Sequence, residues 1–312
     1  AMRAILGQGP LLQPEYVQAH NNLGVTLHDQ GKLDEAAASY RRALALQPDF
    51  GQVRYNLGIT LQDLGRLDEA AASFRQVLLA KPEYAEAHYN LGVILQEQGM
   101  LDEAVACYRR ALALQPELAE AHNNLGIIRN DQGNLDEAVA CYRRALSLKQ
   151  DYPEAHSNLL MCLNYLPRHS VFDYLDEARR FGRKVTQRVT TPFSKWTCPA
   201  EPECLRIGLL SGDFRNHPVG YFLENLLANM NPSRIELIAY PTQAAEDELT
   251  ARIRSRFAAW KPLPGMPDEA AAGLIHDDGV HVLLDLAGHT RHNRLPVFAW
   301  KPAPVQVAWL GY

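Results

Sequence analysis

A single 34-residue period runs through the first half of the chain and restricts its fold more than any other feature. Small residues, an aromatic residue and a proline recur at this step: Gly24, Gly58, Gly92 and Gly126; Gly31, Gly65, Gly99 and Gly133; Ala36, Ala70, Ala104 and Ala138; Tyr40, Phe74, Tyr108 and Tyr142; Pro14, Pro48, Pro82 and Pro116. A unit of this length cannot bury its apolar face alone, so stacked copies must share a continuous core.

Each copy resembles the tetratricopeptide repeat, a pair of antiparallel helices. Gly24 and Ala36 allow the two helices to approach closely, Tyr40 fills the space beside them, and Gly31 supplies the turn between them. Acidic pairs such as Asp34-Glu35 begin each second helix, where the helix dipole favours negative charge. We place an array at 17–166, with full repeats at 17–50, 51–84, 85–118 and 119–152, a partial fifth repeat after them, and the remnant of a preceding repeat at 1–16.

An asparagine ladder is the one repeated feature that packing alone does not require, since asparagine is a mediocre helix former. Its members are Asn22, Asn56, Asn90, Asn124 and Asn158. Side-chain amides both donate and accept, so the ladder could bind the backbone of an extended peptide without reading its sequence. The alternative is that each asparagine bonds a neighbouring helix inside its own repeat. Periodicity does not separate these two interpretations.

Composition excludes several classes of protein. A formal net charge of −5 and dispersed basic residues argue against nucleic acid as a partner. The chain contains no apolar run long enough to span a bilayer and no secretion signal at its start, which predicts a cytoplasmic protein. Its five cysteines lack zinc-site spacing, so we expect reduced, structural thiols and no metal.

The pattern changes after the array. An amphipathic segment at 171–187 predicts a capping helix, and a Thr- and Pro-rich linker completes the region 167–204. From 205 to 312, strands expected at 205–211, 235–242, 280–288 and 305–312 alternate with helices expected at 219–230, 246–260 and 268–279. This order predicts a Rossmann-type parallel sheet, with ligands at the carboxyl ends of the strands.

Two loops at those strand ends carry the candidate chemistry. In "SGDFRNHP", Pro218 suits the first position of a helix and places His217 at the helix cap, where the dipole favours a neutral imidazole. A neutral His217 could accept a hydrogen bond or a proton from a hydroxyl group. In "DLAGHTRHN", Asp285 ends a strand, Gly288 allows close backbone approach, and His289 follows. As bare patterns both loops are weak signals of catalysis, and the first could simply be a polar cap.

The order of these parts carries a more specific signal. An array, a capping helix, then "LRIGLLSGDFRNHPVGYFL" and "IHDDGVHVLLDLAGHTRHNRLPVFAWKPAPVQVAWLGY" resembles the O-linked N-acetylglucosaminyltransferase family, including plant Spindly-type proteins, over essentially the whole chain. The resemblance implies an α-solenoid followed by the N-terminal Rossmann-like half of a glycosyltransferase-B fold. It implies inverting, metal-independent transfer of a sugar to Ser or Thr hydroxyls of protein substrates.

The resemblance also implies roles for particular residues. The family's active-site histidine falls on His217, Asp285 falls at a position lining the acceptor side of the cleft, and His289 is a further candidate. The peptide-binding asparagines of the family fall on the ladder. No cofactor is implied beyond a nucleotide-sugar co-substrate, for which we expect UDP-GlcNAc, although Spindly-type relatives use GDP-fucose and others UDP-glucose.

Relatives continue past the position of Tyr312 into a second Rossmann half that binds most of the donor. We therefore expect this chain to be a fragment that binds peptide and is inactive on its own. One competing hypothesis is a tetratricopeptide scaffold carrying a non-catalytic Rossmann-like remnant. Another is an unrelated Rossmann enzyme fused to repeats.

Overall fold

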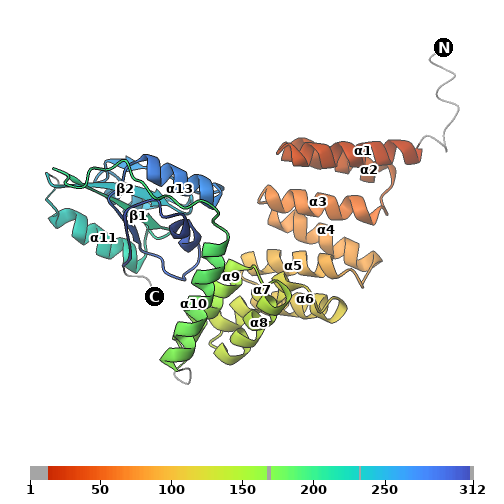
Figure 1. Ribbon diagram of the computed structural model, residues 1–312. Helices are drawn as coiled ribbons and strands as arrows, with labels where there is room; N and C mark the ends of the chain where they lie inside the picture. The colour runs from red at the N-terminus through yellow and green to blue at the C-terminus, as the bar shows by residue number, and fades with distance from the viewer. Residues whose placement is uncertain (1–12, 167–169, 232, 310–312) are drawn as a thin grey trace, which may run out of the picture. The chain divides into compact units, whose positions relative to one another are not determined.

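The computed structural model describes residues 13–166, 170–231 and 233–309 (Figure 1). The chain divides into two compact units, residues 1–150 and 151–312. The predicted repeat remnant at 1–16 lies mostly outside the described residues, and so do positions 310–312 of the predicted last strand. The predicted boundaries of the individual repeats stay predictions.

The first unit is a stack of helix pairs. Its helices are α1 (Gln13–Asp29), α2 (Leu33–Leu46), α3 (Gly51–Asp63), α4 (Leu67–Ala80), α5 (Ala85–Glu97), α6 (Leu101–Leu114), α7 (Ala119–Asp131) and α8 (Leu135–Leu148). Each odd-numbered helix packs against the even-numbered helix that follows it, as Figure 1 shows. The tetratricopeptide interpretation is confirmed for this unit.

The repeated glycines are needed where the paired helices cross. A Cβ atom built on Gly92 would lie 2.7 Å from Cε1 of Tyr108, which is fully buried in the following helix. Gly24, Gly58 and Gly126 meet the aromatic ring of their own repeat in the same way. The second set of glycines has φ between 71° and 76°, as a turn between helices requires. The sequence interpretation of both sets is confirmed.

The second unit contains two helices and a five-stranded sheet. The helices α9 (Pro153–Asn164) and α10 (Val171–Gln187) come first. The sheet follows with β1 (Leu205–Ser211), α11 (Pro218–Asn229), β2 (Ile235–Pro241), α12 (Glu248–Arg254), β3 (Ala259–Trp260), α13 (Asp268–Asp277), β4 (Val282–Asp285), the 3-10 helix η2 (Leu295–Trp300) and β5 (Val305–Ala308). The strands are all parallel, in the order β3-β2-β1-β4-β5.

Both faces of the sheet are covered, and alternation along the strands assigns each residue to one face. Leu209 and Leu237 pack with the helices α11 and α12, whereas their neighbours Leu210 and Ile238 pack with α13 and η2. This is the doubly wound arrangement expected of a Rossmann-type half. Its strand order brings the loops after β1, β2 and β4 to one edge of the sheet.

One predicted element was wrong in its second half. The helix expected over 246–260 covers only α12, and Ala259–Trp260 instead forms the edge strand β3. Phe257 and Trp260 pack in edge-on or tilted contact with Phe214, at ring-centroid distances of 5.8 and 5.4 Å. These tertiary contacts override the local helical pattern.

Among the helices of the described ranges, none is both long and apolar enough to cross a membrane.

Candidate functional site

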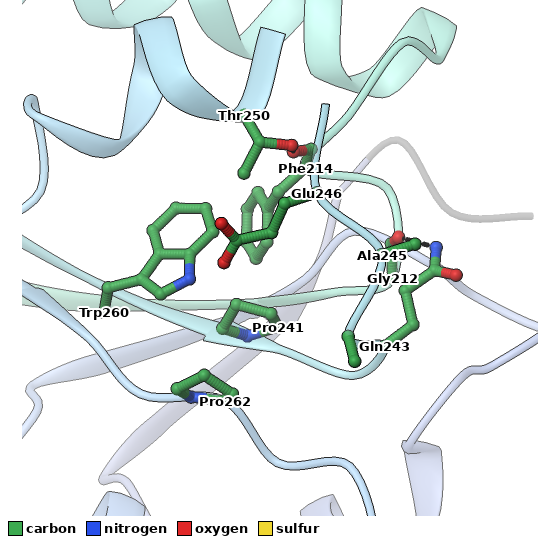
Figure 2. Close-up of a pocket in the computed structure, with 10 residues that line it drawn as sticks. Gly212, Phe214, Pro241, Gln243, Ala245, Glu246, Thr250, Trp260 and Pro262 are labelled. Carbon is green, nitrogen blue, oxygen red and sulfur yellow. Dashed lines mark hydrogen bonds between the residues drawn. The ribbon is translucent and has the colours of Figure 1, made fainter. Parts of the chain in front are cut away.

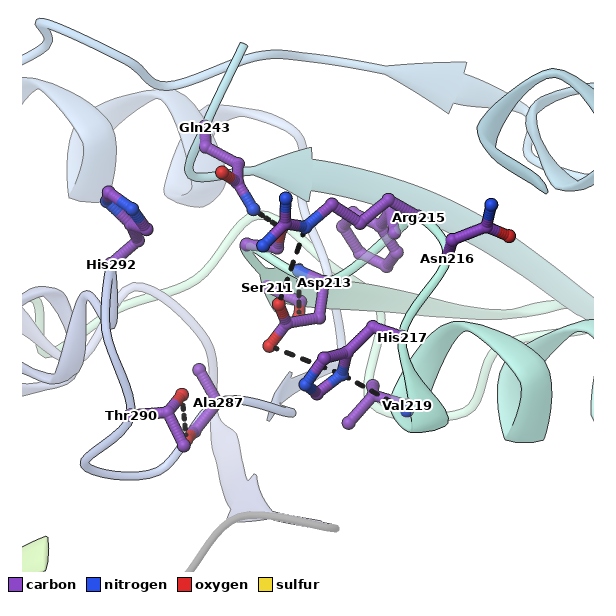
Figure 3. A network of polar contacts seen from close by, with 12 residues as sticks. Ser211, Asp213, Arg215, Asn216, His217, Val219, Gln243, Ala287, Thr290 and His292 are labelled. Atoms are coloured by element: carbon purple, nitrogen blue, oxygen red, sulfur yellow. Dashed lines mark hydrogen bonds and ion pairs between the residues drawn. The ribbon is translucent and has the colours of Figure 1, made fainter. Parts of the chain in front are cut away.

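A polar cluster lies in the loop between β1 and α11, with Asp213, Arg215 and His217 at its centre (Figure 3). Oδ2 of Asp213 lies 3.8 Å from Nδ1 of His217, and Oδ1 of Asp213 lies 3.9 Å from Nε of Arg215. The backbone N–H of Asp213 donates to Oγ of Ser211 at 2.9 Å. Gly220 allows the loop to sit tightly on α11, because a Cβ there would lie 2.1 Å from the Arg215 carbonyl oxygen.

His217 caps α11, as the sequence predicts. Its backbone is extended, Pro218 follows in the first helical turn, and its Nδ1 accepts the backbone N–H of Val219 at 3.3 Å. Because Nδ1 is the acceptor, a neutral ring carries its proton on Nε2. The side chain is 39 % exposed. His217 can therefore present an N–H donor to a ligand, while its other ring nitrogen is held by the helix.

Arg215 is a member of this cluster that the sequence reasoning missed. Its Nε is buried without a hydrogen-bond partner among the described residues, although 41 % of the side chain is exposed. A guanidinium group that is only loosely paired can bind a carboxylate or a phosphate. The signal was present in "SGDFRNHP", where an arginine and an aspartate flank the His-Pro turn at a strand end.

The loop after β4 lies on the other side of the cluster. Oγ1 of Thr242 donates to the carbonyl oxygen of His292 at 2.7 Å, and a Cβ on Gly212 would lie 3.3 Å from Cβ of His292. His292 has a left-handed backbone with φ of 64°. Burial, followed by the charges of Arg291 and Arg215, lowers the pKa of His292. Figure 3 places His292 and Thr290 across from Asp213 and His217.

Asp285 lies at the end of β4, as predicted, but its side chain is enclosed. It is 1 % exposed, Oδ2 accepts the N–H of Gly288 at 2.7 Å, and Oδ1 accepts the N–H of Ala287 at 3.3 Å. Burial raises the pKa of Asp285 to about 6, although these two hydrogen bonds favour the charged form. In this structure Asp285 shapes the turn that begins the loop after β4.

His289 points away from the cluster toward the two helices that open the second unit. Its Nδ1 lies 3.0 Å from Oγ of Ser157 on α9, and its ring meets Phe181 of α10 edge-on at 5.0 Å. Burial, with a further contribution from His156, lowers the pKa of His289 to about 4. The three site residues predicted from the sequence, His217, Asp285 and His289, thus lie in three different surroundings.

A small cavity lies between the loops after β1 and β2 (Figure 2). Its lining includes Phe214, Trp260, Gln243 and Glu246, and Nε2 of Gln243 donates to the carbonyl oxygen of Gly212. Its volume is about 130 Å³. Ligand pockets usually enclose roughly 300–1,000 Å³, so this cavity by itself does not accommodate a nucleotide sugar.

The asparagine ladder links successive repeats of the first unit. Nδ2 of Asn90 donates to Oη of Tyr55 at 2.9 Å, and Nδ2 of Asn56 donates to Oδ1 of Asn21 at 3.1 Å. Asn124 makes longer contacts, to the hydroxyls of Tyr89 and Tyr108. For Asn56, Asn90 and Asn124 these bonds reach the preceding repeat, and not a neighbouring helix of their own repeat as the alternative interpretation supposed. Asn158 lies in the second unit.

The bonds leave one N–H donor of the Asn56 and Asn90 amides available. A side-chain amide has two N–H donors, and Asn56 and Asn90 each use one of them for the preceding repeat. Oδ1 of Asn22 and of Asn56 accepts from a glutamine one turn earlier. Peptide binding by the ladder stays a prediction.

Together these features define the class: a tetratricopeptide array followed by a Rossmann-type parallel sheet with a polar cluster at its strand ends. Residues 182–312 match the model of Glycosyl transferase family 41. Tetratricopeptide models match residues 25–65, 61–99, 85–118 and 127–159. The predicted fold class and the predicted resemblance to the O-linked N-acetylglucosaminyltransferase family are confirmed.

The chain is also similar to individual plant proteins with known sequences. The chain is 33 % identical over 159 residues to the probable UDP-N-acetylglucosamine–peptide N-acetylglucosaminyltransferase SPINDLY of Arabidopsis thaliana, a match covering 49 % of this chain and 17 % of that protein. The corresponding SEC protein of Arabidopsis thaliana is 33 % identical over 109 residues, 35 % of this chain and 11 % of that protein.

A solved structure extends the comparison to the fold. A mutant of Thermobaculum terrenum O-GlcNAc transferase superposes with a TM-score of 0.74 at 32 % identity, over 84 % of this chain and 50 % of that one. The match to this chain therefore spans about a sixth of the SPINDLY protein and half of the Thermobaculum terrenum chain.

Proposed function

We propose that this chain supplies the peptide-binding and acceptor-side parts of a protein O-glycosyltransferase that transfers N-acetylglucosamine from UDP-GlcNAc to Ser or Thr hydroxyls. The observation that carries the proposal is His217 at the cap of α11, at the end of a central strand and inside the glycosyltransferase match. The names of the relatives support the donor and the protein substrate.

The cluster suggests a division of roles. Nε2–H of His217 donates a hydrogen bond to the oxygen of the Ser or Thr hydroxyl or to an oxygen of the nucleotide sugar. This bond orients the hydroxyl against the anomeric carbon. Direct displacement inverts that carbon: the acceptor oxygen bonds to it, the bond to the diphosphate breaks, and the proton of the hydroxyl passes to an oxygen of the departing diphosphate. We assign to Arg215 the role of neutralising the charge that develops on the leaving diphosphate, so that no metal is required. Asp285 holds the loop after β4 through the N–H groups of Gly288 and Ala287.

We further propose that the 312 residues alone bind peptide but do not transfer sugar at a useful rate. The relatives extend far beyond the matched region, and the cavity of about 130 Å³ is too small for the donor. The donor would then be held mainly by residues outside this chain. Peptides would lie along the asparagine ladder.

Donor-dependent labelling of a Ser/Thr peptide library tests the proposal. The full product of the gene is supplied with labelled UDP-GlcNAc, GDP-fucose or UDP-glucose, beside the 312-residue chain and beside His217→Ala in each. We expect UDP-GlcNAc to label peptides in the full product and His217→Ala to reduce labelling by about 10²-fold or more. Circular dichroism checks that the variant is folded.

The competing scaffold hypothesis predicts a different result. Peptides would bind with unchanged affinity, yet no donor would label them in either protein. Labelling that persists in His217→Ala would instead remove the role assigned to this residue. GDP-fucose-dependent labelling would keep the reaction class and replace the donor.

A further inference from the structure

His289 lies in a small enclosure made by α9, α10 and the loop after β4, all within the second unit. Phe181 is buried between two imidazoles, meeting His289 at 5.0 Å and His156 at 5.4 Å, both edge-on. Nε2 of His156 lies 2.7 Å from Oε1 of Glu177, which fixes the ring on the far side of Phe181. Ser157 completes the enclosure through its 3.0 Å contact with His289.

Ser157 occupies a position in the repeat that elsewhere bonds the next repeat. It stands 34 residues after Asn123, in register with Asn21, Tyr55 and Tyr89. In the array, Asn21, Tyr55 and Tyr89 accept a hydrogen bond from the ladder asparagine of the following repeat. At Ser157 the partner is His289, from the loop after β4. His289 thus takes the place that an asparagine has in each earlier contact.

The Ser157–His289 contact involves a residue that is near, along the chain, to a residue beside the polar cluster. His289 faces the helices, whereas His292, three residues later, faces Gly212 and Thr242 beside the cluster. Asp285 fixes the start of the same loop through Gly288. Because both ends of this short segment are held, we infer that release of the His289 ring loosens the backbone that carries His292.

A second contact holds the far end of the loop to the same helices. Phe181 and Val185 of α10, with Leu160 of α9, form a buried apolar group that includes Leu295 and Ala299 of η2. The loop from β4 to η2 is therefore attached to α9 and α10 through His289 and again through η2. The His289 contact involves a hydrogen bond, which gives its ring a defined orientation.

We propose that Ser157 and Phe181 are positioning residues for the transfer reaction: they clamp His289 and so hold His292 and the backbone after β4 beside the Asp213–His217 cluster. The catalytic part of this inference rests on the proposed function, whereas the clamp itself does not. Ser157 and Phe181 act through His289 and touch no substrate.

Hydrogen exchange of the loop tests the clamp without any need for activity. Exchange of backbone amides in the segment 286–294 is followed by mass spectrometry in the 312-residue chain and its Ser157→Ala, Ser157→Thr and Phe181→Leu variants. Ser39→Ala is the matched control, because Ser39 is also 2 % exposed and its Oγ makes one hydrogen bond, to the carbonyl oxygen of His20 in the first unit.

We expect Ser157→Ala to speed exchange of 286–294 by about tenfold, the effect of one lost hydrogen bond. Phe181→Leu should do so at least as much, Ser157→Thr should restore the slow rate, and Ser39→Ala should leave this segment unchanged. An unchanged rate in Ser157→Ala, or the same increase in Ser39→Ala, would overturn the clamp.

Kinetics of the full gene product test the catalytic part. Ser157→Ala should lower kcat several-fold with little change in the KM for peptide, and Ser157→Thr should recover kcat. Faster loop exchange with unchanged kcat would retain the clamp and remove its role in transfer. If no donor labels any peptide in the unmutated protein, the proposed function fails, and the exchange result still decides whether the clamp exists.

Discussion

Replacing His289 by asparagine should change how the stability of the second unit depends on pH. Burial lowers the pKa of His289 to about 4, whereas an unfolded histidine has a pKa of about 6.5. Between these values the unfolded chain takes up a proton that the native imidazole does not. The native state therefore loses stability as pH falls from 6.5 toward 4.

The magnitude follows from the pKa difference. Each pH unit in this window costs about 1.36 kcal/mol, so at pH 4.5 the loss attributable to His289 is about 2.7 kcal/mol. Asp285 acts in the opposite direction, because its pKa of about 6 makes the native state bind a proton that the unfolded state has lost. Its contribution is lost as pH rises toward 6, and the two groups largely offset each other in the unmutated protein.

His289→Asn removes the pH-dependent contribution of the histidine and leaves that of Asp285. At pH 7.5 we expect His289→Asn to cost about 1–2 kcal/mol, because the ring contact with Phe181 is lost while an amide can still bond Ser157. At pH 4.5 the variant no longer carries the cost of about 2.7 kcal/mol, so its stability should exceed that of the unmutated protein by about 1 kcal/mol.

Urea unfolding followed by tryptophan fluorescence measures this difference. Trp196, Trp260, Trp300 and Trp309 are the tryptophans of the chain and all belong to the second unit, so the signal reports that unit. Ile275→Val, a buried apolar change in α13, is the control and should cost about 0.5–1.5 kcal/mol at both pH values. A cost of His289→Asn that is the same at pH 7.5 and 4.5 would refute the reasoning.

Two further predictions concern the helices and the ladder. Gly92→Ala should destabilise the first unit by about 1–3 kcal/mol, because its Cβ would lie 2.7 Å from the buried Tyr108 ring, whereas Gly182→Ala, with nothing within 4 Å, should stabilise α10 by about 0.5–1 kcal/mol. Thermal unfolding followed by circular dichroism measures the effect of Gly92→Ala, and unfolding followed by tryptophan fluorescence measures that of Gly182→Ala. Equal effects of the two substitutions would show that the close helix crossing is not the reason for glycine at position 92. Asn90→Ala should weaken binding of a fluorescent peptide about threefold to tenfold, whereas Tyr55→Phe should leave it nearly unchanged; equal losses would mean that the Asn90–Tyr55 bond has only a structural role.

Local patterns were sufficient for much of the fold. A 34-residue repeat with Gly24 in the first helix and Tyr40 in the second specifies how the two helices cross. Only glycine, which has no side chain, fits against the Tyr40 ring. Pro218 likewise restricts the start of α11, so the position of His217 at the helix cap could be read from adjacent residues. In these cases the deciding interactions lie within one repeat or one turn.

Other features depended on residues far apart in the chain. Trp260 joined a strand because of its packing against Phe214, and Asp285 proved to be enclosed by its own turn. His289, like His217, is a loop histidine that follows a strand, yet it faces α9 and α10. Periodicity and turn chemistry in the sequence determined most of the helices, strands and loops, with the segment that ends at Trp260 as an exception. Only the tertiary structure decided which way a loop side chain points, because that depends on the distant surfaces that pack against it.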